Sequence, residues 1–192
     1  MQAYDVLCRK IDALLAGEES IRVAIDGHAA AGKTSLAAYL NARYDCNVFH
    51  MDHFFLRPEQ RKPERLAQLG GNVDYERFKA EVQEPLLAGV PFAYRPFNCR
   101  TGDFEAEVDI KPKQLAVVEG AYSLHPTLAD VYHIKVFLTI SPREQLRRIE
   151  ARDGEKLLGR FESEWIPMEH RYFETCNIPQ GCDFIFGEEL AE

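Results

Sequence analysis

The sequence has 192 residues, of which 46% are hydrophobic and 28% charged, so one domain with a full hydrophobic core is expected. Its net charge of -8 disfavours nucleic acid as a partner, because an acidic surface repels polyphosphate chains. No apolar run approaches membrane-spanning length, and five scattered cysteines favour a reducing, cytoplasmic setting. The first 15 residues mix charged and apolar side chains, which predicts an amphipathic helix rather than a signal peptide.

Short apolar runs then alternate with helical patterns along the chain. Residues 35–43 have helical spacing, Asp74 is a good cap for a helix that follows it, and Pro142 begins another helix. Residues 92–110 are rich in turn formers and aromatics, which indicates an excursion from the main fold. The apolar runs predict strands at 21–26, 47–50, 115–119, 134–140 and 183–186. This alternation predicts an α/β fold, a doubly wound parallel sheet with helices on both faces.

A glycine-containing motif, G-x-x-x-x-G-K-[ST], directly follows the first predicted strand. In such a loop the backbone N–H groups point at phosphate oxygens, and the next helix adds the positive end of its dipole. Lys33 would reach the β- and γ-phosphates, and the Thr34 hydroxyl would bind Mg²⁺. We therefore predict that ATP and Mg²⁺ bind at Gly27, His28, Ala29, Ala30, Ala31, Gly32, Lys33, Thr34 and Ser35.

Two acidic residues stand where predicted strands end. Asp52 follows the strand at 47–50, and Glu119 ends the strand at 115–119. Ligands of a doubly wound sheet bind beyond the carboxyl ends of its strands, so Asp52 should face the γ-phosphate. There it would accept the proton of an attacking hydroxyl or help to hold Mg²⁺, and Glu119 would orient Mg²⁺ or its waters. A helix cap and a strand-end ion pair are the structural alternatives for these acids.

Five motifs occur in an order that resembles the uridine kinase-like branch of the P-loop kinases, which includes uridine kinase, phosphoribulokinase, bacterial pantothenate kinase and nicotinamide riboside kinase. The resemblance covers roughly residues 21–165. It implies one kinase domain over 1–192, with an acceptor-side insertion at about 53–110 and a lid at about 147–162. The motifs are the phosphate loop, Asp52-His53-Phe54-Phe55, Asn72-Val73-Asp74, Val117-Val118-Glu119-Gly120 and Arg147-Arg148-Ile149-Glu150-Ala151-Arg152-Asp153.

The resemblance also implies roles for single residues. Asp52 would be the catalytic base, Asp74 would bind sugar hydroxyls of the acceptor, and Tyr94 would lie beside its base. Arginines of the lid would reach the transferring phosphate or the acceptor. The implied catalytic residues are Asp52, Lys33, Arg148 and Arg152; the acceptor would be bound by Asp52, His53, Phe55, Asp74, Tyr94 and Arg148, and the metal by Thr34, Glu119 and Asp52.

These patterns predict a kinase that phosphorylates a hydroxyl of a nucleoside-like metabolite, of the uridine, cytidine or nicotinamide riboside type. Aromatic residues near the motifs favour a nucleoside, whereas Arg95 and Arg100 leave a sugar phosphate open. A pantothenate-like alcohol as acceptor, and a nucleotide-binding module without catalysis, also remain alternatives. A regulatory GTPase is disfavoured, because neither D-x-x-G nor N-K-x-D occurs. We expect a small-molecule acceptor and neither nucleic acid nor membrane as partner, and homo-oligomerisation is left open.

Overall fold

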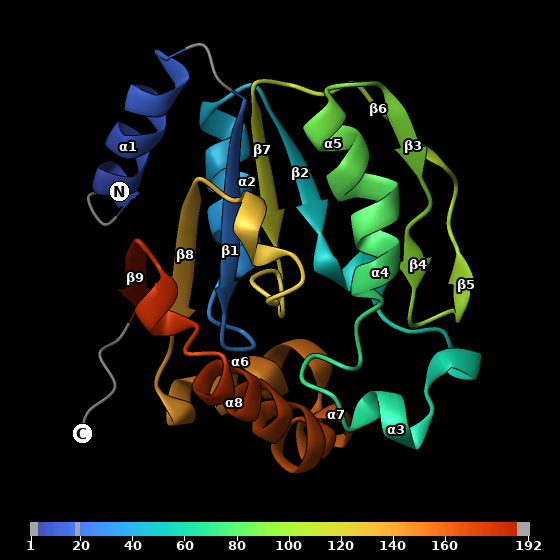
Figure 1. The fold of residues 1–192 in the computed structure, drawn as a ribbon. Helices are drawn as coiled ribbons and strands as arrows, with labels where there is room; N and C mark the ends of the chain where they lie inside the picture. Colours follow the sequence, from blue (N-terminus) through green and yellow to red (C-terminus); the bar gives the residue numbers. More distant parts are fainter. Residues whose placement is uncertain (1–3, 18–19, 188–192) are drawn as a thin grey trace.

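The computed structural model describes residues 4–17 and 20–187. Figure 1 shows a central sheet covered by helices on both faces. All five of its strands run parallel, in the order β2-β7-β1-β8-β9. The α/β fold with a doubly wound parallel sheet is therefore confirmed. The strands are β1 (Ile21–Gly27), β2 (Cys46–His50), β7 (Leu115–Glu119), β8 (Ile134–Thr139) and β9 (Phe184–Gly187).

The predicted elements agree closely with the observed ones. Each strand begins and ends within one residue of its predicted bounds. Helix α1 (Asp5–Leu15) confirms the amphipathic helix near the start, and residues 1–3 lie outside the described residues. Helix α2 (Lys33–Arg43) begins at Lys33, directly after Gly32 in a left-handed conformation. The lysine of the phosphate loop therefore belongs to the first turn of the helix.

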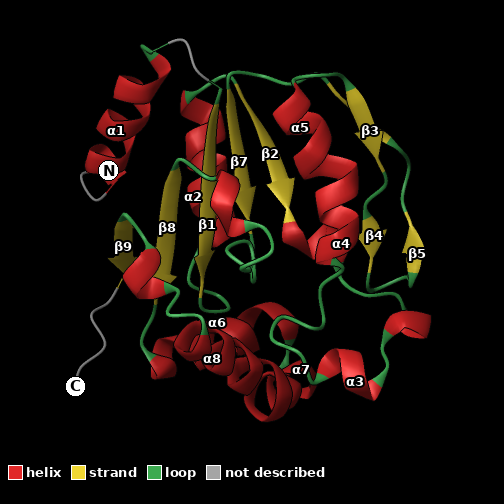
Figure 2. Cartoon of the chain, in the orientation of Figure 1, coloured by secondary structure: helices red, strands yellow, loops and turns green. Residues whose placement is uncertain are grey.

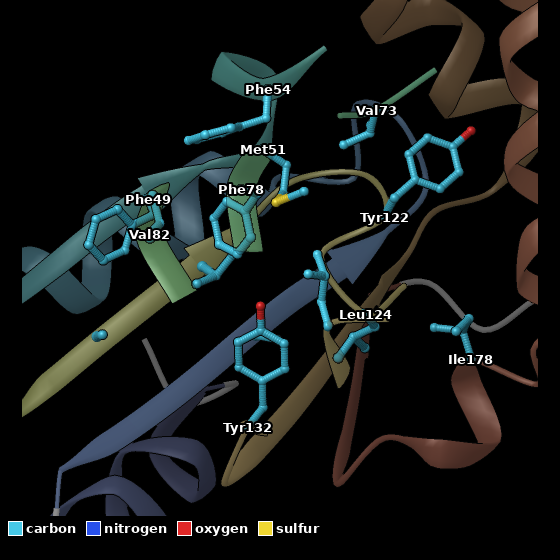
Figure 3. Packing of buried hydrophobic residues seen from close by; sticks show 14 of the residues in the cluster. Phe49, Met51, Phe54, Val73, Phe78, Val82, Tyr122, Leu124, Tyr132 and Ile178 are labelled. Atoms are coloured by element: carbon cyan, nitrogen blue, oxygen red, sulfur yellow. The ribbon is translucent and has the colours of Figure 1, made fainter. Parts of the chain in front are cut away.

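Alternation along the central strand separates two hydrophobic cores. Val23 and Ile25 of β1 face the core that α1 and α2 cover, and Ala24 between them faces the other core. Figure 3 shows part of this second core, where Phe49 from β2 lies near Phe78 of the helical segment beside it. Both faces of the sheet are thus buried, as a parallel sheet requires. Among the described residues, no helix is long and apolar enough to cross a membrane.

Two further groups of elements lie around the sheet, one beyond the carboxyl ends of its strands and the other along its β2 edge (Figure 1). Helices α6 (Pro142–Asp153), α7 (Glu155–Arg160) and α8 (Ile166–Thr175) lie beyond these ends (Figure 1). The predicted lid, residues 147–162, corresponds to the second half of α6, all of α7 and the first two residues after it. A second group lies beside β2 (Figure 2). It consists of α3 (Pro63–Leu66), α4 (Tyr75–Phe78), α5 (Glu84–Ala88) and two small antiparallel pairs, β3 (Phe92–Tyr94) with β6 (Val108–Ile110) and β4 (Phe97–Asn98) with β5 (Asp103–Phe104).

A matched pair of leucines tests how much the core under α2 stabilises the fold. Leu40 of α2 is fully buried, whereas Leu87 of α5 is 47% exposed. We expect Leu40→Ala to lower the free energy of unfolding by about 2–5 kcal/mol, because it removes buried methyl groups and leaves a cavity. Leu87→Ala should change it by about 0.5 kcal/mol or less. Urea unfolding of both variants measures the difference, and equal losses would contradict the assignment of Leu40 to the core.

Candidate active site

The loop between β1 and α2 has the curled backbone that phosphate binding requires. Ala30 and Gly32 have positive φ angles of 59° and 99°, which turn successive peptide groups towards the inside of the loop. Gly27 has a φ of 136°, and a Cβ atom there would lie 2.1 Å from the Leu138 carbonyl oxygen. The loop therefore runs directly against β8, and glycine is required at its first position.

Lys33 points back into this loop. Its Nζ donates hydrogen bonds to the carbonyl oxygens of Gly27, at 2.6 Å, and His28, at 2.8 Å. A cation thus lies inside the ring of backbone groups, next to the N-terminus of α2. Both features attract a phosphate group.

Thr34 and Glu119 meet beside the loop, as the parallel sheet predicts. The Thr34 hydroxyl donates to the two carboxylate oxygens of Glu119 at 3.2 and 3.3 Å. Glu119 is buried and also lies 2.5 Å from Nδ1 of His50, its neighbour across strands β2 and β7. This hydrogen bond raises the pKa of His50, and burial opposes the rise. Sequence reasoning missed His50, although its position at the end of a strand beside Glu119 could have indicated it.

Asp52 lies in the turn after β2 and belongs to the same charged cluster. Water reaches its side chain, yet the surrounding protein atoms desolvate the carboxyl group, and this is the main cause of its raised pKa. The negative charge of Glu119 raises the pKa of Asp52 further, whereas the positive charges of Lys33 and Arg152 lower it. The structure therefore brings together the loop lysine, the strand-end acid and Asp52.

The donor set fits a magnesium ion that also binds phosphates and water. Within the described residues, no group of three or more His, Cys, Asp and Glu side chains could hold a metal ion by itself. Mg²⁺ in kinases takes few protein ligands, however, and prefers hydroxyl and carboxylate oxygens. The adjoining Thr34 hydroxyl and Glu119 carboxylate supply these, and Asp52 would be the third group of the predicted set.

His53 and Tyr94 lie together on the side that is predicted to bind the acceptor. Nδ1 of His53 is 3.3 Å from the Tyr94 hydroxyl. The Tyr94 ring is only 5% exposed and stacks on Phe54 with 5.5 Å between ring centroids. Tyr94 therefore presents its hydroxyl to this side, while most of its ring belongs to the core. This differs from the ring beside a nucleobase that the resemblance implies.

Asp74 lies next to Phe55, because the Asp74 N–H donates to the carbonyl oxygen of Phe54 at 2.7 Å. The predicted helix cap is confirmed, because Oδ1 of Asp74 accepts from the Arg77 N–H at 3.1 Å. Its Oδ2 accepts from Nε2 of Gln60 at 2.7 Å, and the side chain is buried. Phe55 is half-buried and forms an isolated bridge with Val73. Contact of Asp74 with an acceptor remains a prediction; each of its carboxylate oxygens already accepts one hydrogen bond and can accept a second.

The predicted lid arginines take different positions. Arg148 reaches the phosphate loop, where its guanidinium donates to the Ala30 carbonyl oxygen at 3.3 Å. Arg152 pairs with Asp153 at 2.7 Å, and its charge acts on Asp52. Arg160 instead pairs with Glu164 on its own helical segment at 2.8 Å. Arg148 and Arg152 thus lie near the site.

Several buried groups at the site were missed by the sequence analysis. Asp26, fully buried before the loop, accepts from the N–H groups of Gly27 and Leu124 and from the Tyr172 hydroxyl. Burial raises the pKa of Asp26. Gln145 and Glu169 hold the loop from the other side. An acid inside the apolar run before the motif was the only signal for Asp26.

A cavity of about 840 Å³ lies beyond the carboxyl ends of β8 and β9, next to the loop. His28 forms one wall, and its ring lies 5.4 Å from that of Phe137 and 5.3 Å from that of Phe173. Burial lowers the pKa of His28 to about 4. Two buried polar atoms at this cavity, His28 Nδ1 and Thr139 Oγ1, have no hydrogen-bond partner within the described chain. Aromatic walls of this kind suit a heterocyclic ring.

The sheet order and the loop together define a P-loop fold, and solved structures agree. A possible uridine kinase from Bacillus stearothermophilus is similar with a TM-score of 0.66 at 18% identity, over 94% of this chain and 99% of that chain. A protein from Silicibacter sp. named for a fructose transport system kinase has a TM-score of 0.63 at 20% identity, over 88% and 90%.

A D-glycerate 3-kinase from Cryptococcus neoformans is similar with a TM-score of 0.54 at 14% identity, over 78% of each chain. No protein-family model and no curated protein matches the sequence. The chain thus has the fold of uridine kinase-like and related P-loop kinases.

Proposed function

We propose that the chain is a kinase that uses ATP and Mg²⁺ to phosphorylate a hydroxyl group of a small metabolite. The observation that carries this proposal is the cluster of Lys33, Thr34, Glu119 and Asp52 at the carboxyl ends of three adjacent strands. Asp52, whose pKa is shifted by burial and by the charges of Glu119 and Lys33, supplies the base that transfer to a hydroxyl requires. The kinase fold of the similar structures supports the same proposal.

Different residues of the chain would bind the phosphates, activate the acceptor and exclude water. Bound Mg-ATP supplies the activated γ-phosphoryl group, for which Lys33 and the loop N–H groups neutralise charge. Asp52 orients the acceptor hydroxyl and takes its proton as the new O–P bond forms and ADP leaves. Arg148 and Arg152 approach from the predicted lid, whose closure would exclude the water that competes as an acceptor.

A nucleoside-like acceptor, of the uridine, cytidine or nicotinamide riboside type, is our first candidate. The hydroxyl of Tyr94, the imidazole of His53 and the half-buried ring of Phe55 supply polar and aromatic contacts on the acceptor side. A smaller acceptor, such as a sugar or a hydroxy acid, is the second candidate. The buried ring of Tyr94 favours it, because little of this ring is free to stack on a base.

An acceptor screen tests the proposal. The protein would be incubated with Mg-ATP and a mixture of uridine, cytidine, nicotinamide riboside, pantothenate, ribulose 5-phosphate, fructose and glycerate. Mass spectrometry would then detect any compound that gains a phosphoryl group. We expect one product class, formed by the unaltered protein and strongly reduced in Asp52→Asn. If ATP binds but neither this mixture nor a metabolite extract is phosphorylated, a non-catalytic module becomes the better interpretation.

A further inference from the structure

One residue of the phosphate loop, Ala29, is held at both its N–H and its carbonyl group by buried side chains. Oε2 of Glu169, on α8, accepts a hydrogen bond from the Ala29 N–H at 2.9 Å. Nε2 of Gln145, on α6, donates to the Ala29 carbonyl oxygen at 3.2 Å. Glu169 is 6% exposed and Gln145 is 3% exposed. Two helices outside the sheet thus fix the orientation of the two peptide groups that flank Ala29.

Helix α8 has a second attachment to the same loop. Tyr172 lies one turn after Glu169, so both side chains share a face of the helix. The Tyr172 hydroxyl donates to Oδ2 of Asp26 at 2.9 Å, while Oδ1 of Asp26 accepts from the Gly27 N–H at 2.8 Å. The first and third residues of the loop are therefore positioned by one face of α8.

A carboxyl group at the buried position of Glu169 is energetically less favourable than an amide would be. A buried carboxylate loses its hydration, and an amide oxygen could accept the same hydrogen bond without charge. Burial is accordingly the main cause that raises the pKa of Glu169, to about 7. Titratable groups surround it from several elements: Lys33 of α2 favours the charged form, whereas Asp26 of β1 and Asp52 after β2 disfavour it. Tyr122 after β7 also lies near, and burial together with the charge of Glu169 raises the pKa of Tyr122.

We propose that Glu169 is a positioning residue of the phosphate loop, and that binding of a nucleoside di- or triphosphate to this loop is coupled to uptake of a proton by Glu169. The inference rests on the proposed function, since it requires phosphates in the loop. The phosphates add negative charge on the side of the loop where Lys33 lies, so the neutral form of Glu169 is favoured in the complex. The proton moves from solvent to a carboxylate oxygen of Glu169, and no other bond changes.

The sign of the pH dependence follows from this coupling. Below about pH 7 Glu169 is already protonated in the free protein, so little additional proton uptake accompanies binding. Above this pH the free protein carries a charged Glu169, and binding must first bring in a proton. Nucleotide affinity should therefore fall as pH rises, by up to about tenfold for each unit by which the pKa of Glu169 rises on binding.

The test is calorimetric binding of Mg-ADP between pH 6.5 and 8.5, in buffers with different ionisation enthalpies. We expect the unaltered protein to take up protons above pH 7 and to bind about three- to tenfold more weakly at pH 8.5 than at pH 6.5. Glu169→Gln keeps the acceptor for Ala29 without the charge, and should bind within about twofold of the unaltered protein at pH 6.5. Its affinity should no longer depend on pH beyond the titration of ADP itself.

Two further variants separate positioning from charge. Glu169→Ala leaves the Ala29 N–H without its acceptor and should weaken ADP binding at every pH, which Glu169→Gln should not. Glu162→Gln, an exposed acid on the preceding segment, is the control and should retain the pH dependence of the unaltered protein.

Equal pH dependence in Glu169→Gln and the unaltered protein would overturn the proton coupling. Unchanged affinity in a folded Glu169→Ala would overturn the positioning role. If the unaltered protein binds no nucleotide, the proposed function is contradicted together with this inference. If it binds nucleotide without taking up a proton, only this inference is contradicted.

Discussion

Lys33→Ala should reduce turnover of ATP by at least about 10²–10³-fold, the loss seen when a single preorganised group that stabilises transition-state charge is removed. The Lys33 ammonium lies inside the loop, 2.6 and 2.8 Å from two loop carbonyl oxygens. Removing it leaves these carbonyl dipoles facing the phosphates with no cation between them. The measurement is steady-state phosphorylation of the acceptor found in the screen, together with the affinity for Mg-ATP.

A matched control separates this effect from a general loss of positive charge. Lys79 is exposed on the helical segment between α4 and α5, away from the loop. Lys79→Ala should retain turnover within about twofold, as expected for a surface substitution. Lys33→Ala should remain folded, which circular dichroism can check. If it retained more than a tenth of the activity, Lys33 would not be the phosphate-binding lysine.

Parallel-sheet geometry explains why so much of the site could be predicted. The carboxyl ends of parallel strands meet at one edge, so residues that end different strands converge even when they are far apart in sequence. Thr34 and Glu119 are 85 positions apart and are joined by hydrogen bonds. Asp52 follows a third strand and lies close enough to Glu119 for the charge of Glu119 to raise its pKa beyond the effect of burial. Strand ends were therefore sufficient to place these groups together.

The contacts of the helices could not be found in this way. Glu169 reaches Ala29 across 140 positions, and only the packing of α8 against the loop determines this. In the sequence, Glu169 is an acid on the same helical face as two aromatic residues. An exposed acid at the edge of a buried helix face gives the same pattern, so the sequence does not distinguish the two. Tyr94 shows the same limit, since an aromatic residue beside predicted site residues can bury its ring in the core.

Asp52→Asn should lower turnover by about 10²–10⁴-fold while ATP affinity changes little. The amide cannot take a proton from the acceptor hydroxyl, but it has nearly the same size and removes one negative charge from the neighbourhood of Lys33 and Glu119. Less repulsion of the phosphates should hold ATP binding constant or strengthen it slightly. The measurements are single-turnover phosphorylation of the acceptor and calorimetric binding of Mg-ATP.

The ratio of these two effects distinguishes a catalytic base from a group that only helps to hold the metal. If Asp52 mainly bound Mg²⁺, Asp52→Asn would weaken Mg-ATP binding, and raised Mg²⁺ would restore much of the activity. If it is the base, no concentration of Mg²⁺ restores turnover. Asp109→Asn, an exposed acid on β6, is the matched control and should leave both measurements unchanged. Turnover of Asp52→Asn within a few-fold of the unaltered protein would exclude Asp52 as the base, and His53 beside it would then be the next group to test.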